Sequence, residues 1–202
     1  MQAEDITLLL TYKLLIFTEG KFGQQMYIPQ DIAIILGWIS SINPFANIFF
    51  TETALATGLM GTIPLILIFL AFEQIQANSV GEIRQLLLDT LGPGLQDRHW
   101  TDLLILALIA GIAEELLFRG VIQPWIEQFL GVTAGLVISN CMFGLVHAVT
   151  PLYALLAGIV GMYLGLSLNY GTEKNLLVPI IIHGLYDFLA FVALIRMYRK
   201  SL

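Results

Sequence analysis

The sequence predicts an all-α, polytopic membrane protein with about six transmembrane helices and one amphipathic helix on the membrane surface. Of its 202 residues, 57% are hydrophobic and only 12% are charged, and the mean hydropathy is +0.83. Soluble domains usually have about a quarter charged residues. The apolar residues also fall in runs of roughly 17–25, the length that crosses about 30 Å of hydrocarbon as a helix.

Charge and cysteine content exclude several classes of protein. The formal net charge of −6 argues against a nucleic-acid partner, because nucleic-acid-binding proteins carry basic patches. The single cysteine, Cys141, excludes an intramolecular disulfide and a cysteine-based zinc site. The first residues are acidic and no small-residue cleavage site follows them, so we expect no signal peptide.

Residues 1–98 are expected to form an N-terminal part with an interfacial segment, a transmembrane hairpin and an amphipathic linker. The apolar run 6–17 is short and is interrupted by Lys13, which suits a helix at the membrane interface. Residues 21–30 are expected to form a loop that leads into the hairpin.

Two uncharged runs predict the hairpin. Residues 32–50 are expected to form the first span, with a kink or break at the Asn-Pro pair 43–44. Residues 53–72 are expected to form the second span. Only residues 51–52 separate the two, so we expect them to pack as a tight antiparallel pair.

A polar segment, 73–98, follows the hairpin. Apolar and polar residues between Val80 and Asp89 alternate as in an amphipathic helix that lies on a membrane surface. The Gly-Pro-Gly sequence 92–94 should break the chain there. We therefore place the boundary with the second part, 99–202, just after this segment.

Residues 99–202 are expected to form a helical catalytic core with four further spans. Gly120 to Gly131 is too short and too polar to span. The four expected spans are 100–119, 132–149, 152–168 and 176–195.

Six spans place both termini on the same side of the membrane. Seven of the nine lysines and arginines fall on that side. The positive-inside rule then predicts that both termini of this multi-pass protein are cytoplasmic.

Three charged residues end the otherwise apolar run 103–113. Inserting a charged side chain at the centre of a membrane helix costs roughly 2.5–3.5 kcal/mol of free energy, so three such residues indicate a structural or functional role. Glu115 and Arg119 are four residues apart on one helix face, which predicts a structural ion pair. Glu114 is rotated about 100° from Glu115 and should face a different neighbour.

Two histidines fall inside predicted spans and could be that neighbour. A single intramembrane histidine is more often a helix–helix hydrogen-bonding residue than a catalytic one. His147 and His183 occur together with several acids in a very apolar part of the chain, which favours a shared site. Asp187 shares a helix face with His183, and Phe143 precedes His147 by one turn.

The candidate catalytic residues are therefore Glu114, His147, His183 and Asp187. An apolar pocket raises the pKa of a carboxylate, which suits Glu114 as the base that takes a proton from water. His147, His183 and Asp187 could instead hold zinc or another divalent metal that activates the same water. Both routes lead to hydrolysis.

Asp187 leaves three alternatives open. An ionised carboxylate only accepts hydrogen bonds, so it would repel a developing oxyanion. Asp187 could be a metal ligand, it could donate as the neutral acid, or it could orient His183 through a ring N–H.

Three motifs occur in a fixed order: Glu114-Glu115-x-x-x-Arg119, Phe143-x-x-x-His147 and His183-x-x-x-Asp187. They resemble the motifs of the CPBP family (CAAX protease and bacteriocin-processing, or Abi) of intramembrane endopeptidases, which includes type II CAAX prenyl proteases. The resemblance covers roughly 100–195. It implies that the first glutamate is the base, the second-motif histidine its partner, and the third motif a set of oxyanion or metal contacts. Many relatives have asparagine where this chain has aspartate.

We therefore expect an intramembrane endopeptidase that hydrolyses a peptide or membrane-protein substrate in or near the lipid bilayer. The first alternative is a catalytically inactive immunity or scaffold membrane protein that keeps the same fold. The second is a proton-coupled transporter, because Glu/His clusters also relay protons. Transporters usually contain inverted repeats, and none is visible in this sequence.

The depth of the site residues in the membrane gives a further expectation. With the third span running outward and the fourth inward, His147 should lie roughly 10 Å or more deeper than Glu114 at 1.5 Å per residue. We therefore expect Gly120 to Gly131, with Pro124 as the break, to fold back into the protein interior. The fourth helix would then start deeper, or the third would continue further, until His147 and Glu114 face each other.

Overall fold

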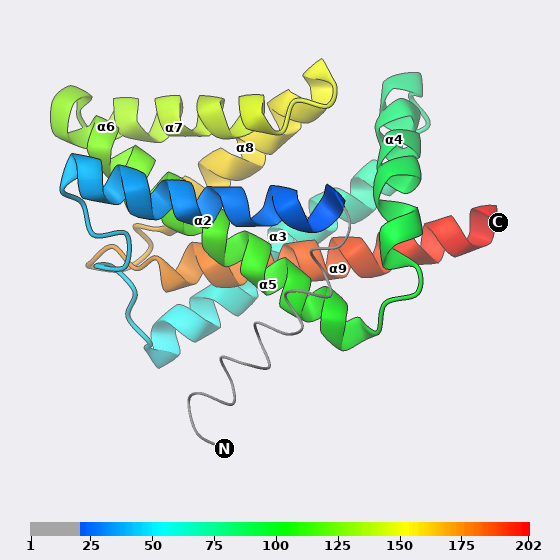
Figure 1. Ribbon diagram of the computed structural model, residues 1–202, viewed down its shortest axis with the longest axis horizontal. Coiled ribbons are helices and arrows are strands. Elements are labelled where there is room, and N and C mark those ends of the chain that lie inside the picture. The colour runs from blue at the N-terminus through cyan, green and yellow to red at the C-terminus, as the bar shows by residue number, and fades with distance from the viewer. Residues whose placement is uncertain (1–20) are drawn as a thin grey trace.

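The computed structural model describes the backbone of residues 21–202 and the side chains of residues 31–202, and this part of the chain is helical without strands (Figure 1). The all-α prediction is confirmed for these residues. The interfacial helix expected at 6–17 lies outside them. The helices are α2 (Lys21–Ser40), α3 (Glu52–Glu73), α4 (Asn78–Leu95), α5 (Trp100–Leu117), the π-helical η1 (Phe118–Ile122), α6 (Gln123–Leu130), α7 (Val132–Val146), α8 (Pro151–Ser167) and α9 (Leu177–Ser201).

The centre of the molecule is the crossing of α5 and α9, and the other helices pack around this pair (Figure 1). A methyl group added at Gly111 would lie 3.0 Å from the backbone N of Gly184, so two glycines let the helices meet closely. Glu115 lies one turn beyond Gly111, and His183 precedes Gly184. The close crossing therefore brings these two side chains to one place.

The first expected span, 32–50, is wrong, and so is the loop expected at 21–30. α2 includes residues 21–30 and ends at Ser40. Ser41 then adopts a positive φ of 56°, and the Asn43 side chain accepts a hydrogen bond from the N–H of Phe45 (3.0 Å). This Asx turn encloses Pro44, which has no N–H to donate. The helix therefore ends close to the point where a kink or break was predicted.

The predicted tight hairpin of the first two spans is also wrong. α2 packs mainly against α5, whereas α3 packs against α9. Their connection is held instead to the loop before α9, because the Asn175 side chain donates to the carbonyl of Phe49 (2.8 Å). The N–H of Leu176 also donates to the carbonyl of Asn47 (2.7 Å).

α4 has the amphipathic character that its sequence predicts, but the expected break at 92–94 is wrong. Its buried residues include Ile83, Leu88 and Leu95, and α4 packs against α9 near the C-terminus (Figure 1). The helix continues through Pro93 to Leu95. A Cβ at Gly92 would lie 2.3 Å from the Tyr198 ring, so contact with α9 holds this turn in place.

Within the described residues, two helices are long and apolar enough to cross a membrane, α3 and α9. Six spans are therefore not confirmed. α5 is 18 residues long but contains three carboxylates, and α7 and α8 have only 15 and 17 residues. Many apolar side chains of α3 point outward, among them Met60, which is 69% exposed. An exposed apolar face of this extent is typical of contact with lipid or with another protein.

The break expected at Pro124 is wrong, whereas the third helix continues further, which was one of the two ways expected to bring Glu114 and His147 to one level. α5 passes through η1 into α6, which ends at Gly131 (φ 83°). In η1 the N–H of Gln123 donates to the carbonyl of Phe118, five residues back, which adds one residue to the turn. Pro124 lies in the first turn of α6, where no N–H is needed.

Candidate active site

The structure brings the four candidate residues Glu114, His147, His183 and Asp187 together. The Oε2 atom of Glu114 lies 3.4 Å from Nε2 of His147 and 3.9 Å from Nε2 of His183. Asp187 Oδ2 lies 3.5 Å from the same His183 nitrogen. Their roles in catalysis remain predictions, but their convergence gives the chain one candidate site.

The expected depth difference between Glu114 and His147 disappears because of the α6–α7 turn. Glu114 precedes Gly131 by about as many residues as His147 follows it. α6 and α7 pack against each other on either side of this glycine. The continued third helix and the returning fourth helix therefore bring the two side chains to the same level.

The contact expected between Glu115 and Arg119 is present and fully buried. Arg119 Nη1 donates to Glu115 Oε1 at 2.8 Å, and the two residues are 1% and 0% exposed. Arg119 Nη2 donates to Asn140 Oδ1 (2.7 Å) and to the carbonyl of Gly161 (2.6 Å). The guanidinium thus fixes α5, α7 and α8 to one another beneath the site.

Glu115 has a second partner that its helix position did not indicate. The Nδ1 atom of His183 lies 2.8 Å from the same Oε1 that accepts from Arg119. A carboxylate only accepts, so Nδ1 carries the hydrogen, and the Nε2 of a neutral ring keeps a lone pair. The buried ion pair therefore sets both the orientation and the tautomer of His183.

His147 is held in the same way from its own helix. Its Nδ1 lies 2.8 Å from the carbonyl of Phe143, which can only accept. The hydrogen is again on Nδ1, and Nε2 faces Glu114. At 3.4 Å the contact is long for a hydrogen bond, as contacts of a general base often are before substrate binds.

These tautomers make the site rich in acceptors. Two imidazole Nε2 atoms and the carboxylates of Glu114 and Asp187 face one another, and Glu114 Oε2 is buried without a hydrogen-bond partner among the described residues. Such groups repel unless a proton, a water or a substrate donor lies between them. The arrangement is therefore suited to binding and moving a proton.

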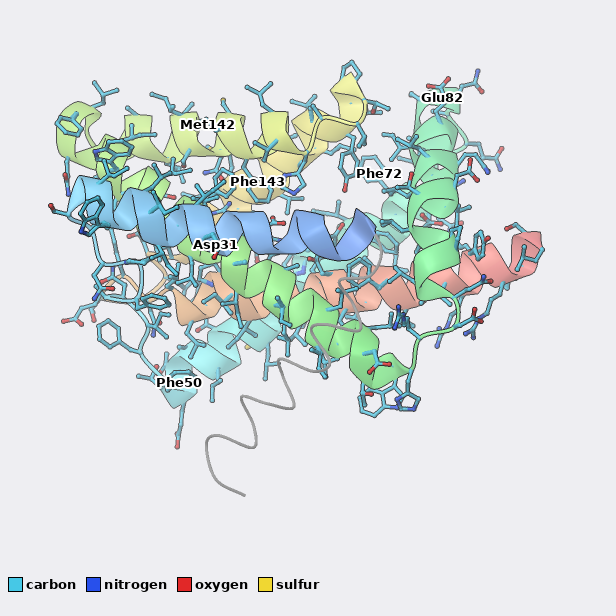
Figure 2. The ribbon with its side chains drawn as sticks, in the orientation of Figure 1. Asp31, Phe50, Phe72, Glu82, Met142 and Phe143 are labelled. Carbon is cyan, nitrogen blue, oxygen red and sulfur yellow. The ribbon has the colours of Figure 1, made fainter. Side chains whose placement is uncertain are left out.

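Phe143 forms the aromatic wall of the site. It lies on the side of α7 that faces α2 and α5, whereas its neighbour Met142 is 41% exposed (Figure 2). Its ring stacks on His147 with centroids 4.4 Å apart and meets Phe118 edge-on at 5.0 Å. The Arg119 guanidinium carbon lies 4.9 Å from the same ring centroid. Phe143 thus keeps His147 in one orientation and separates it from the buried arginine.

Three of the site side chains are partly exposed. The side chains of Glu114, His147 and Asp187 keep 20%, 28% and 23% of their surface exposed, whereas His183 keeps 8% and Glu115 none. A substrate can therefore reach the first three residues, and His183 lies at the inner end.

The metal expected at His147, His183 and Asp187 stays a prediction. Among the described side chains, no three His, Cys, Asp or Glu residues gather in an arrangement that could hold a metal ion. The two histidine Nε2 atoms are directed at a glutamate oxygen between them. No catalytic step is therefore assigned to a metal.

Sequence reasoning missed the groups that bind Arg119 from other helices. Asn140 is a lone amide in an apolar helix, and its polarity was the only signal available. The carbonyl of Gly161 gave no signal, because a backbone group has no residue type. Both contacts depend on how α7 and α8 pack beside η1.

Comparison with known proteins gives a family match to part of the chain. Residues 96–189 match the family described as "Type II CAAX prenyl endopeptidase Rce1-like". No curated protein and no solved structure matches the chain. The four candidate residues, Glu114, His147, His183 and Asp187, fall within the matched stretch.

Proposed function

This chain is related through residues 96–189 to the CPBP/CAAX protease family, and on that premise we propose that it is an intramembrane endopeptidase in which Glu114 activates water. The observation that carries the proposal is the position of Glu114 Oε2 opposite the Nε2 atoms of His147 and His183.

The proposed reaction is hydrolysis of a peptide bond. A water between Glu114 and His147 gives a proton to the Glu114 carboxylate as its oxygen attacks the substrate carbonyl carbon. The carbonyl oxygen becomes an oxyanion in the tetrahedral intermediate. When the C–N bond breaks, Glu114 returns the proton to the leaving amine, and the other product is a carboxylic acid.

His183 and Asp187 are proposed to stabilise the charge that develops. Glu115 holds the Nδ1–H of His183, so the other ring nitrogen faces the reacting groups. Asp187 lies 3.5 Å from that nitrogen and can share a proton with it. As the neutral acid, Asp187 would donate to the oxyanion rather than repel it.

We propose that the protein is multi-pass and that both termini are cytoplasmic. The exposed apolar side chains of α2, α3, α7 and α8 support this topology, since such surfaces suit a lipid environment. The distribution of lysine and arginine gives the orientation.

The test is comparative membrane proteomics of cells that express the wild type or the Glu114→Gln variant. The proposal predicts new peptide termini that appear with the wild type and vanish with Glu114→Gln. Glu173→Gln is the matched control, because it makes the same change at an exposed carboxylate and should give the wild-type pattern.

Identical termini with wild type and Glu114→Gln would contradict the proposal. An inactive immunity or scaffold protein would give that result, because such a protein keeps the fold without needing a base.

A further inference from the structure

The proposed hydrolysis needs a hydrogen-bond donor that its four residues do not supply when both histidines are neutral and both acids are ionised. The Nδ1–H groups of His147 and His183 are bonded to the carbonyl of Phe143 and to Glu115. Both point away from Glu114. An oxyanion in acyl transfer is usually bound by fixed N–H or O–H donors, and losing one costs about 10²–10³ in kcat. A neutral donor would therefore have to come from a neighbouring helix.

Tyr153 lies on the face of α8 that borders the site. The helix begins at Pro151, and the Thr150 side chain accepts the N–H of Tyr153 at 3.1 Å, which fixes this first turn. Ala157, one turn on, packs against the apolar cluster that contains Phe143. Gly161, two turns on, binds Arg119 through its carbonyl. Residues spaced by four share a helix face, so Tyr153 lies on the same face of α8 as the two residues that border the site.

The Tyr153 side chain is placed near both carboxylates. Its hydroxyl lies within electrostatic reach of Asp187 and Glu114. The neighbouring Tyr186 lies within electrostatic reach of Asp187 and of Tyr153.

The Tyr153 hydroxyl is also free to bind a ligand. The side chain is half-buried, and it takes part in no hydrogen bond among the described residues. Tyr163 on the same helix is different, because its hydroxyl donates to the carbonyl of Gly61 at 2.7 Å. Half-buried tyrosine hydroxyls normally find a partner, so an unpaired one beside two acids indicates a place for substrate.

We infer that the Tyr153 hydroxyl donates a hydrogen bond to the oxyanion of the tetrahedral intermediate. This role rests on the proposed endopeptidase function. A phenol suits it because it stays neutral and donates without drawing a proton from the histidines or carboxylates. Tyr153 thus supplies the donor that the neutral histidines and ionised acids lack.

The test compares wild type with Tyr153→Phe, using the purified full chain in lipid nanodiscs and an internally quenched, prenylated CAAX peptide as probe. We expect kcat to fall about 100-fold and KM to stay within about twofold, because the hydroxyl acts on the intermediate and not on the bound substrate. The melting temperature should be unchanged.

Tyr163→Phe is the matched control from the same helix. It removes a hydroxyl with a structural partner, so it should lower the melting temperature and leave kcat unchanged. A Tyr153→Phe enzyme with wild-type kcat, beside an inactive Glu114→Gln enzyme, would overturn the inference alone. Equal turnover by wild type and Glu114→Gln would instead contradict the proposed function.

Discussion

At the residue scale, Glu115 links the stability of the site to its chemistry. Its Oε1 accepts from both Arg119 and His183, while its Oε2 is buried without a hydrogen-bond partner among the described residues. The contact with Arg119 could be predicted from a spacing of four. The contact with His183 could not, because it depends on the tertiary crossing of α5 and α9.

Glu115→Gln is expected to impair both properties. The uncharged amide leaves the buried Arg119 cation without its counter-charge, and breaking a buried pair typically costs about 3–5 kcal/mol. The kcat of any folded fraction should also fall, because the amide no longer fixes the His183 tautomer. Thermal unfolding in detergent and turnover of the prenylated peptide measure the two effects. Unchanged stability would contradict the assigned burial of this pair.

Asp187→Asn tests whether Asp187 acts as a metal ligand or as a donor. An asparagine amide can donate to the oxyanion in place of a neutral acid. We therefore expect the variant to keep activity within about tenfold of wild type. Both proteins should be insensitive to a chelator. Loss of wild-type activity on chelation, with recovery on adding zinc, would contradict the metal-free account.

At the scale of elements, the positions of the site residues depend on which helices pack closely together, more than on where each helix begins and ends. The apolar runs predicted most of the helices, but they did not show that α2 packs on α5 or that α3 packs on α9. The η1 turn also escaped prediction, since a π-turn has no distinct composition. Which helix packs against which depends on where small residues allow two backbones to approach closely. A single sequence does not show which of these surfaces meet.

Gly144→Ala is expected to separate α7 from α8. A Cβ at Gly144 would lie 2.5 Å from the carbonyl oxygen of Ala154, which belongs to the backbone and cannot rotate away. Overpacking of this kind typically costs about 1–3 kcal/mol. Because Phe143 and His147 flank this glycine on α7, kcat should fall as well.

Gly81→Ala is the matched control for that change. Its Cβ would meet nothing within 4 Å, so it should keep activity and raise the free energy of unfolding by roughly 0.5–1 kcal/mol, as expected for alanine in a helix. Equal effects of the two substitutions on the melting temperature would contradict the close α7–α8 approach.

At the scale of the whole molecule, the polar network and the apolar exterior divide the protein into two regions. Glu115 and Arg119 are buried at the centre, whereas large apolar side chains such as Trp38 (84%) and Phe50 (81%) lie on the outside. This is the reverse of a soluble protein and agrees with a membrane-associated family. Composition alone predicted this feature, because the chain has too few charged residues to cover its surface.

The central claim is that Glu114 activates a water that cleaves a peptide bond. The most direct measurement is hydrolysis of the prenylated CAAX peptide by the reconstituted chain in ¹⁸O-labelled water, read by mass spectrometry of both products. The account predicts one ¹⁸O atom in the new C-terminal carboxylate with wild type and with Glu173→Gln, and no product with Glu114→Gln. The same labelled product from Glu114→Gln at the wild-type rate would contradict it.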